Sequence, residues 1–302
     1  MTIANILTKR NINILVTGAS GYIGSHLCKI LHDNISCRLS VLKNVRHPEY
    51  DCKENAHIYF DHSYFGVDVR EFSTDIEYDV VVHLAGMISV EESNHKPDLY
   101  YDVNVNGTAN ILKIKSKHFI FASTAGAFNP TNPYAISKII AEDLIKSSDT
   151  PYTIFRFFNV AGSNGEFGQI GPSTHLIRVL SEVAMGKRNQ FSLYGNDYDT
   201  RDGTCVRDYI HVEDIGYSIL KAIKNGPKNS QYECLGHGIG YSNKEVLDIF
   251  QEATNTKIPY TIAPRRQGDP AILIVESISD LSSKKYNIDD MCKSAYQYER
   301  TH

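Results

Sequence analysis

The chain has 302 residues, 42% of them hydrophobic and 22% charged, as is usual for a globular protein with a main domain and a smaller second one. Its formal net charge of −4 gives no reason to expect nucleic acid or an anionic membrane as a partner. No apolar run approaches the length that spans a bilayer, so we expect no membrane segment.

The cysteines follow no metal-binding spacing. None belongs to a CxxC pair or clusters with histidines, so we predict reduced thiols, a cytoplasmic location and no metal site. Residues 1–10 lack the long apolar core of a secretion signal, which favours the same location. The six cysteines are Cys28, Cys37, Cys52, Cys205, Cys234 and Cys292.

In chain order, the first recognisable feature is a glycine-rich turn. An apolar run at 13–17 predicts a short strand, Gly18, Gly21 and Gly24 follow it, and an apolar stripe then predicts a helix. Gly18 permits the turn, Gly21 lets the backbone approach a pyrophosphate, and Gly24 lets helix and strand pack closely. This order predicts a dinucleotide site with its phosphates at the helix N-terminus.

The end of the second predicted strand, residues 38–42, leaves the identity of the dinucleotide open. A carboxylate at this place holds the ribose 2′-hydroxyl of NAD, whereas a basic residue suits the 2′-phosphate of NADP. The chain has Lys43 and Arg46 there, with no acid before Glu49. Both cofactors therefore remain open, as does a solvated basic pair without a ligand.

Two further positions follow predicted strands. Asp68 closes the third strand and is placed to meet an adenine amino group, the alternative being an exposed loop carboxylate. Residues 78–85 form a nearly continuous apolar run, as expected of a strand covered on both faces, and Gly86 then allows a ligand to approach the backbone. The segment between Asp68 and Tyr78 is too short for a full crossover helix.

The stretch from 119 to 146 carries the candidate chemistry. A buried strand is predicted to end in Ser123 and Thr124, whose hydroxyls can hold the oxygen of an alcohol or carbonyl. In the helix that follows, Tyr134 and Lys138 lie four residues apart and therefore on one face. We expect the ammonium and the positive helix end to lower the pKa of the phenol from about 10. The pattern indicates proton transfer to a C–OH group beside a hydride acceptor, the alternative being an ordinary surface pair.

Capping signals support this helix start. Asn132 can accept a hydrogen bond from the first turn, and Pro133 suits the first helical position. Another buried strand is predicted at 152–159.

Alternating strands and helices predict an α/β fold with a doubly wound, Rossmann-like parallel sheet and a smaller C-terminal substrate-binding lobe. We assign residues 1–162 to the dinucleotide-binding domain and expect 205–236 to return to it. The substrate-binding lobe is then formed by 163–204 and 237–302.

Together these motifs resemble those of a known superfamily. The chain is similar to the extended branch of the short-chain dehydrogenase/reductase superfamily and, within it, to the UDP-glucose (UDP-galactose) 4-epimerase family. The general marks are Gly18-x-x-Gly21-x-x-Gly24, Asp68 and Tyr134-x-x-x-Lys138, and the closer ones are the runs 100–108, 195–212 and 263–269. The likeness extends from about Ile12 to Lys285.

The resemblance implies roles for individual residues. Tyr134 is the acid/base, Lys138 its electrostatic partner, and Ser123 and Thr124 bind the 4-oxygen of the sugar. The implied cofactor-binding residues are Gly18, Gly21, Tyr22, Ile23, Gly24, Lys43, Asp68, Val69, Leu84, Ala85, Gly86, Asn104, Tyr134, Lys138 and Phe158. The implied substrate-binding residues are Thr124, Tyr134, Asn159, His175, Leu176, Arg207, Arg266 and Asp269. Arginine suits the diphosphate because its planar fork binds phosphate in a bidentate way, and Asp269 is expected to hold the uridine ribose.

The implied activity is inversion of C4 of a UDP-hexose by transient hydride transfer to bound NAD. Leu273, where the family often has a bulky Tyr, leaves N-acetyl sugars open as substrates. A homodimer through helices at 110–117 and 134–146 is also implied. An NADP-dependent sugar-nucleotide reductase and a catalytically silent nucleotide-binding protein are the alternatives. Ala125-Gly126-Ala127 argues against a dehydratase or decarboxylase, which would carry an acidic residue just after Thr124.

Overall fold

The computed structural model describes residues 11–43, 59–171, 173–227, 232–266 and 268–302. By their contacts the residues divide into two compact units. Unit 1 comprises Met1–Arg156 and Gly216–Glu233, and unit 2 comprises Phe157–Ile215 and Cys234–His302.

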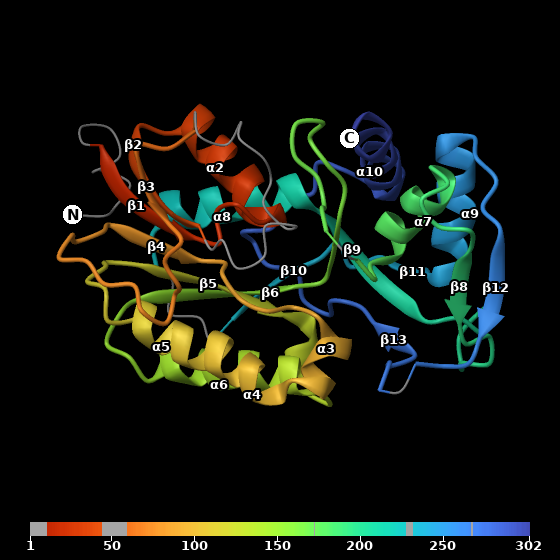
Figure 1. The fold of residues 1–302 in the computed structure, drawn as a ribbon, viewed down its shortest axis with the longest axis horizontal. Helices are drawn as coiled ribbons and strands as arrows, with labels where there is room; N and C mark the ends of the chain where they lie inside the picture. Colours follow the sequence, from red (N-terminus) through yellow and green to blue (C-terminus); the bar gives the residue numbers. More distant parts are fainter. Residues whose placement is uncertain (1–10, 44–58, 172, 228–231, 267) are drawn as a thin grey trace. The chain divides into compact units, whose positions relative to one another are not determined.

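Unit 1 is built on a seven-stranded sheet in the order β10-β6-β5-β4-β1-β2-β3 (Figure 1). The pairs of β1 with β2 and β4, of β2 with β3 and of β4 with β5 are all parallel. The strand order reverses between β1 and β4, which is where open α/β sheets bind ligands. The predicted doubly wound sheet is thus confirmed. Its strands are β1 (Ile12–Thr17), β2 (Cys37–Lys43), β3 (His62–Phe65), β4 (Val80–His83), β5 (Phe119–Thr124), β6 (Tyr152–Phe157) and β10 (Glu233–Leu235).

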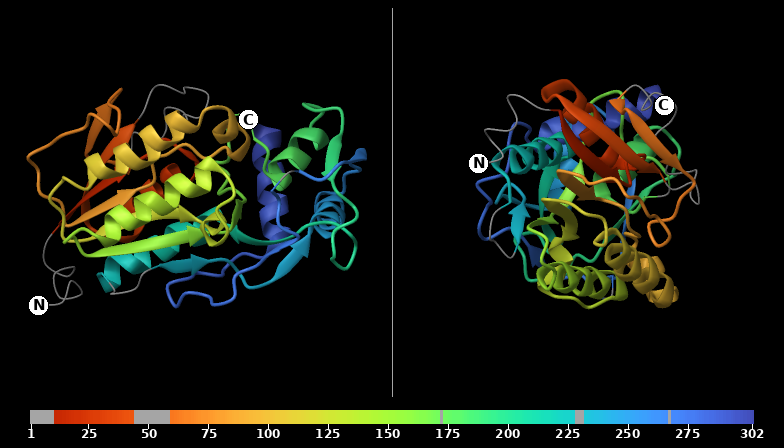
Figure 2. Two further views of the ribbon diagram at one scale, coloured as in Figure 1. Left: turned by 90° about the horizontal axis from the view of Figure 1, so that it is seen from below. Right: turned by 90° about the vertical axis from the view of Figure 1, so that its left-hand side faces the viewer.

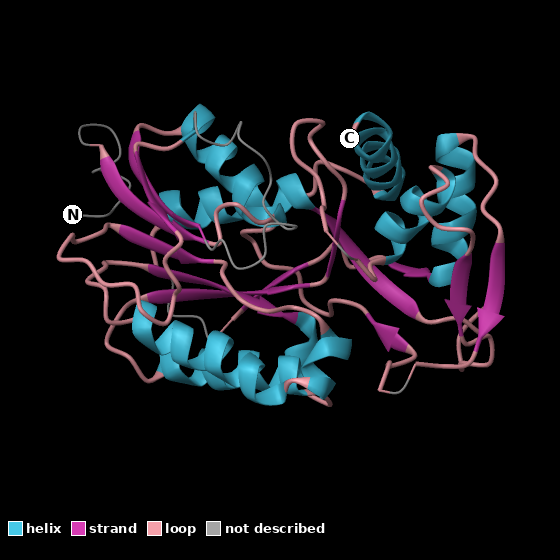
Figure 3. Ribbon diagram, in the orientation of Figure 1, coloured by secondary structure: helices cyan, strands magenta, loops and turns pink. Residues whose placement is uncertain are grey.

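Helices cover both faces of this sheet (Figures 2 and 3). On one face lie α2 (Tyr22–Asn34) and α8 (Val212–Asn225), which meet so closely that a Cβ on Gly216 would come 2.4 Å from Ile30 Cδ1. On the other face lie α3 (Val90–His95), α4 (Pro97–Tyr101), α5 (Gly107–Ile111) and α6 (Pro133–Lys146), with a π-helical turn (Asp102–Asn106) between α4 and α5.

Two connections are shorter than a full crossover. Residues 66–79 connect β3 to β4 without a helix, as predicted. The helix expected over 110–117 is wrong beyond Ile111, where α5 ends. The chain turns there because the Asn110 side chain is held by the carbonyls of Val69 and Phe72, at 2.9 and 2.8 Å, and Ser116 already pairs with Tyr78.

The core of unit 1 fixes α6 against the sheet. Leu15, Val81 and Phe119 from the strands pack with Ala141 and Ile145 from α6, and all are buried. Burial of an aliphatic or aromatic side chain contributes roughly 1.5–3 kcal/mol, so the apolar face of α6 stays on the sheet. The residues at the start of α6 are thereby held in place.

Unit 2 contains a mixed sheet and three packed helices. In the sheet, β9 (Val206–His211) pairs in parallel with β7 (Asn159–Ala161) and β13 (Ile272–Leu273) and antiparallel with β11 (Gly240–Ser242). A second pair joins β8 (Phe191–Tyr194) to β12 (Tyr260–Ala263). The expectation that 205–236 returns to the first domain holds for only part of that range: β9 pairs within unit 2, whereas Gly216–Glu233 groups with unit 1 and β10 pairs with β6 in its sheet. The edge between the units also lies at 156 rather than 162.

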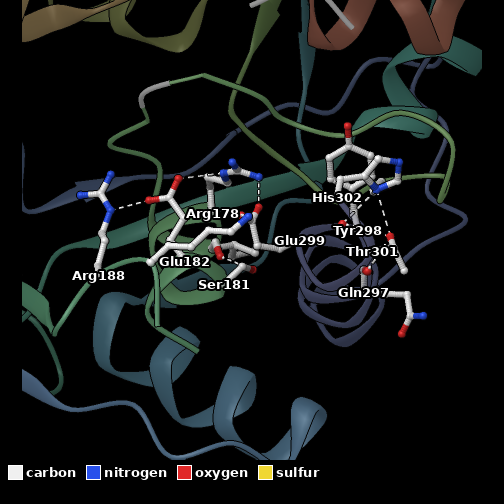
Figure 4. A network of polar contacts seen from close by, with 12 residues as sticks. Arg178, Ser181, Glu182, Arg188, Gln297, Tyr298, Glu299, Thr301 and His302 are labelled. Atoms are coloured by element: carbon white, nitrogen blue, oxygen red, sulfur yellow. Dashed lines mark hydrogen bonds and ion pairs between the residues drawn. The ribbon is translucent and has the colours of Figure 1, made fainter. Parts of the chain in front are cut away.

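The helices of unit 2 are held by an apolar core and by a buried ionic network. The helices α7 (Leu176–Ala184), α9 (Asn243–Thr254) and α10 (Ile288–Thr301) pack around Leu180, Phe250 and Met291. Near the end of α10, the buried carboxylate of Glu299 pairs with Arg178 of α7 and with Lys187 (Figure 4). A buried carboxylate is stable only when it is paired, so this network ties α10 to α7.

Candidate functional site in unit 1

The glycine turn between β1 and α2 has the shape that a dinucleotide requires. Gly18 adopts a left-handed backbone with φ of 69°, and a Cβ on Gly24 would lie 2.2 Å from the carbonyl oxygen of Gly18. No side chain caps α2 at Gly21, so the positive end of this helix is open to an anion. Tyr22 and Ile23 form the first turn of the helix, as predicted.

Lys43 and Asp68, predicted to lie near the ribose 2′-group and the adenine of the dinucleotide, have different surroundings. Lys43 ends β2 with its side chain largely buried, and its Nζ lies 5.3 and 5.4 Å from the ring centres of Phe60 and Phe65. Arg46 and Glu49 lie outside the described residues. Asp68 is 5% exposed, so the exposed loop carboxylate considered for this position is wrong. The backbone and side chain of Arg70 donate to the Asp68 carboxylate at 2.8–2.9 Å.

Sequence reasoning missed a chain of hydrogen bonds at the carboxyl ends of β1 and β4. Ala85 N donates to Thr17 Oγ1 at 3.2 Å, and Thr17 Oγ1 lies 2.7 Å from His83 Nδ1. His83 Nε2 lies 3.1 Å from Thr108 Oγ1, which donates to the carbonyl of Asn104 at 2.6 Å. This sequence of partners suits a neutral imidazole. Burial, with the nearby charge of Lys138, lowers the pKa of His83 to about 3.

Asn104, predicted to bind cofactor, holds the loop after β4. Its Oδ1 accepts from Met87 N at 2.8 Å, and its Nδ2 donates to Met87 O at 3.0 Å and to Ser137 Oγ at 2.9 Å. A Cβ on Gly86 would lie 2.9 Å from Asn104 Oδ1, so glycine is needed for this contact. Leu84 and Ala85 precede Gly86 in the same loop, and Val69 packs against Gly107. Asn104 thus fastens the ligand-side loop to α6.

The start of α6 is built as the sequence predicts. Asn132 Oδ1 accepts from Ala135 N at 2.9 Å, and Pro133 occupies the first turn. Tyr134 is partly exposed and packs edge-to-face against Tyr100, with ring centres 6.5 Å apart. The side chain of Lys138 is buried and its Nζ lies 4.2 Å from the centre of the Phe121 ring.

The pKa values of this pair correct one expectation. Burial raises the pKa of Tyr134, and a side-chain hydrogen bond with Thr124 opposes the shift only in part. The predicted lowering is therefore wrong for the protein without ligands, because burial outweighs the stabilisation of the phenolate. Burial also lowers the pKa of Lys138 to about 7, against the charge of Glu142, which raises it. Lys138 thus changes charge near neutral pH.

The two hydroxyls at the end of β5 are not equivalent. Thr124 Oγ1 accepts from Gly126 N at 3.1 Å, and the influence of Thr124 on the pKa of Tyr134 indicates that it lies near the phenol. Ser123 is buried and donates its proton to Glu142 Oε1 at 2.6 Å. Glu142 was not predicted from the sequence, although it stands four residues after Lys138 and therefore on the same helix face.

Candidate substrate residues in unit 2

Three of the predicted substrate residues lie around β9 and the segment before β13. Arg207 Nη2 lies 3.7 Å from Asp269 Oδ1, and Arg207 Nη1 donates to Val206 O at 2.9 Å. The guanidinium of Arg266 lies 4.0 Å from the centre of the Tyr194 ring. Its neighbour Arg265 instead pairs with Asp197 at 2.8 Å. The structure thus brings Arg207 and Asp269 together.

The remaining predicted residues lie elsewhere in unit 2. Asn159 opens β7 and donates to the carbonyl of Asp208 at 3.0 Å. His175 precedes α7, with its Nδ1 3.0 Å from Gln169 Nε2, and Leu176 begins the helix. Phe158, predicted to contact cofactor, is buried and its N–H donates to Leu235 O at 3.1 Å.

Three further features of the described part of the chain concern metal binding, membrane-spanning helices and the state of the cysteines. There, no group of three His, Cys, Asp or Glu residues could hold a metal ion. No helix in the same ranges combines the length and apolarity needed to cross a bilayer. The five cysteines in those ranges are free thiols.

Comparison with known proteins gives consistent matches. Residues 14–234 match the model of the NAD dependent epimerase/dehydratase family. A UDP-glucose 4-epimerase of Halalkalibacterium halodurans is 34% identical over 327 residues, covering 96% of each chain. The crystal structure of UDP-glucose 4-epimerase from Bifidobacterium longum in complex with NAD+ and UDP is 29% identical, with a TM-score of 0.82 over 96% of this chain and 98% of that one. The UDP-Glc/GlcNAc 4-epimerase from Campylobacter jejuni is 30% identical, with a TM-score of 0.76 over 97% and 100%.

Proposed function

The chain belongs to the NAD-dependent epimerase/dehydratase family, and we propose that it inverts C4 of a UDP-hexose such as UDP-glucose or UDP-galactose. The observation that carries the proposal is similarity over 96% of the chain to a UDP-glucose 4-epimerase, in a chain that has Thr124, Tyr134 and Lys138 in the expected pattern. Thr124 lies near enough to Tyr134 to affect the pKa of its phenol, and Lys138 lies one turn further along the helix of Tyr134.

NAD fits the glycine turn of unit 1. The left-handed Gly18, the close approach at Gly24 and the uncapped start of α2 together form a cradle that a side chain would fill. Lys43 and Asp68 stand at the ends of neighbouring strands, where the adenosine half is expected, and Gly86 adjoins Lys138. NAD supplies the hydride acceptor and donor for C4 of the sugar.

The residues of the chain supply proton transfer and orientation. Tyr134 exchanges a proton with the 4-oxygen of the sugar, and Thr124 holds that oxygen through its hydroxyl. Because burial raises the pKa of Tyr134, its ionisation depends on positive charge close to the phenol. Lys138, with a pKa of about 7, supplies such a charge when it is protonated.

The UDP part of the substrate is assigned to unit 2. Arg207 and Arg266 bind the diphosphate, Asp269 the uridine ribose, and Asn159, His175 and Leu176 line the substrate. The pairing of Arg207 with Asp269 supports this assignment, because it holds the guanidinium in place before substrate arrives. The ring of Tyr194 supports Arg266 in the same way.

The sugar accepted by the enzyme is expected to depend on Leu273. Leu273 lies in β13 and pairs with Arg207 of β9. It therefore lies beside a residue that we propose binds the diphosphate. A leucine there leaves more room than a tyrosine, so we propose that N-acetylated UDP-hexoses are accepted along with UDP-glucose and UDP-galactose. The likeness to the UDP-Glc/GlcNAc 4-epimerase of C. jejuni supports this.

The proposal is tested by incubating the purified protein with UDP-galactose and separately with UDP-N-acetylgalactosamine. We expect UDP-glucose and UDP-N-acetylglucosamine to form without added cofactor, and mass spectrometry of the nucleotide released on denaturation to identify NAD. Absence of C4 inversion with every sugar would overturn the proposed activity.

One alternative has an observation in its favour. Lys43 ends β2, where a cation suits the 2′-phosphate of NADP, so a sugar-nucleotide reductase is the second candidate. That enzyme would oxidise added NADPH in step with a keto-sugar nucleotide and would release NADP on denaturation. Binding of a dinucleotide without either activity would instead identify a silent binding protein.

We also propose a cytoplasmic homodimer. The exposed side chains of Leu99 on α4 and Ile140 on α6 give this side of unit 1 apolar surface that a second copy can cover. The free cysteines suit a reducing compartment. Sedimentation at micromolar concentration is expected to give twice the mass of the 33.9 kDa chain, and a monomer would remove this part of the proposal.

A further inference from the structure

Glu142 is a fully buried carboxylate that contacts Ser123, a residue of the predicted site. Ser123 Oγ donates to its Oε1 at 2.6 Å, and Arg156 donates to both of its oxygens, from Nε at 2.9 Å and from Nη2 at 2.7 Å. Lys146 reaches Oε2 at 3.3 Å. Neighbours on β5, β6 and α6 therefore hold the carboxylate in one orientation.

Arg156 is itself anchored. Its guanidinium lies 4.8 Å from the ring centre of Phe128 and 4.0 Å from that of Tyr232, and the two rings pack edge-to-face. A guanidinium stacked on two aromatic rings and bonded in a bidentate way has little freedom to turn. The position of Glu142 is thus set by a rigid partner.

This arrangement decides how the Ser123 hydroxyl can act. A serine hydroxyl has one proton to donate, and here that proton goes to Glu142, so the oxygen can only accept hydrogen bonds from other groups. A hydroxyl of this kind accepts a hydrogen bond from the sugar 4-hydroxyl or from Tyr134, and it does not compete as a donor.

Glu142 also stands one helical turn after Lys138, and we propose that it is a positioning residue for the reaction. It fixes Ser123 as a hydrogen-bond acceptor and, through its charge, favours the ammonium form of Lys138. This inference rests on the proposed function. The upward effect of the Glu142 charge on the pKa of Lys138 agrees with it.

Apart from Tyr134, whose phenolate carries a negative charge when it forms, the groups around Lys138 do not offer such a charge. His83 on β4 is neutral at physiological pH because its pKa is about 3, Phe121 of β5 is apolar, and Asn104 is uncharged. The charge of Glu142, by contrast, raises the pKa of Lys138.

The test uses two variants of the holoenzyme. Glu142→Met combined with Arg156→Met removes both buried charges together, a change that folded proteins often tolerate. We expect this variant to keep its nucleotide, to lose about tenfold in kcat with KM within about twofold, and to move the alkaline limb of the kcat profile to lower pH by about one unit. The limb moves down because the charge of Glu142, rather than that of Arg156, acts on Lys138, so Lys138 then loses its proton at lower pH.

Glu142→Asp separates the two effects. It keeps the charge but withdraws the carboxylate from Ser123, so kcat is expected to fall while the alkaline limb stays in place. Glu299→Gln is the matched control, since Glu299 is buried and paired with Arg178 and Lys187; it is expected to lower stability without moving the limb.

The outcomes distinguish this inference from the proposed function. If the unmodified enzyme inverts C4 but the double variant has an unchanged kcat and pH limb, the positioning role is wrong and the proposed function stands. Should the double variant not fold, a Glu142→Asp enzyme with unchanged kcat, or with a limb shifted to lower pH, contradicts the role equally. An unmodified protein without C4 inversion overturns the proposed function itself.

Discussion

At the scale of single residues, the chemistry depends on two side chains whose burial opposes their charged forms. Burial raises the pKa of the Tyr134 phenol and lowers that of the Lys138 ammonium to about 7. Burying either charge alone costs free energy, whereas a phenolate and an ammonium side by side stabilise each other. In the proposed mechanism, proton transfer at one group therefore depends on the other.

Replacing Tyr134 with Phe removes the proposed acid/base and little else. We expect kcat to fall by at least about a hundredfold, the lower range for general acid–base catalysis. The aromatic contact with Tyr100 is kept, so folding and bound nucleotide should be unchanged when measured by thermal unfolding and mass spectrometry. Tyr152→Phe, at the start of β6, is the control with normal turnover. Near-normal activity of the Tyr134 variant would exclude the assigned role.

At the scale of secondary structure elements, α6 presents the site because its start is capped and its apolar face is buried. Asn132 satisfies a backbone N–H of the first turn, and Ala141 and Ile145 lock the helix on the sheet. Tyr134 lies within this first turn, so fraying at Asn132 would reach the phenol directly.

Asn132→Ala is expected to lower the free energy of unfolding by about 1 kcal/mol, the usual loss for an N-cap. Urea unfolding followed by circular dichroism measures the change. Asn132→Ser retains a side-chain acceptor and should stay close to the unmodified protein. Equal stability of all three proteins would show that the cap contributes nothing.

At the scale of the whole molecule, the proposed ligands divide between the two units. The glycine turn and the acid/base belong to unit 1, whereas the arginines assigned to the diphosphate belong to unit 2. A substitution that prevents binding of the diphosphate in unit 2 should therefore leave the dinucleotide bound in unit 1.

Arg266→Met tests this division. We expect KM for the UDP-sugar to rise about tenfold or more, because a charge-assisted phosphate contact is lost, while the bound nucleotide stays at its normal level. Arg265→Met is the matched control, since Arg265 pairs with Asp197, and its KM should not change. A similar KM increase in both variants would point to general loss of positive charge rather than to a specific contact.

Buried histidines in both units predict loss of stability in acid. Burial lowers the pKa of His118 and of His211 to about 4 and of His83 to about 3, whereas the unfolded chain binds a proton near pH 6.5. The unfolded state therefore binds more protons below about pH 6.5, and the free energy of unfolding falls from there as pH approaches the folded values.

Urea midpoints between about pH 7 and pH 4 measure this loss. His118→Gln can retain a hydrogen bond to Thr153 without titrating, so between about pH 7 and pH 4 its free energy of unfolding should fall by about 3 kcal/mol less than that of the unmodified protein. His32→Gln, at an exposed site, should follow the unmodified protein. Parallel curves for all three proteins would contradict this account.

Much of the fold and of the candidate site was predictable from local patterns. Parallel strands that are buried on both faces have apolar sequences. Gly18 and Gly24 indicate a turn that only glycine fits, and Asn132-Pro133 indicates the start of α6. These signals lie within a few residues of one another, so no knowledge of distant contacts is needed. The end of α5 at Ile111 was missed because it depends on the carbonyls of Val69 and Phe72, about forty positions earlier.

By itself, the sequence determined the doubly wound sheet and the dinucleotide turn and predicted the acid/base pair, since each of these depends on residue type and spacing. Only the tertiary structure decided the charge state of that pair and which buried residues contact the site. The direction of the Tyr134 pKa shift, the neutral His83 and the carboxylate that takes the proton of Ser123 all depend on burial and on partners from other strands. Desolvation is a property of the packed interior, and spacing along the chain does not encode it.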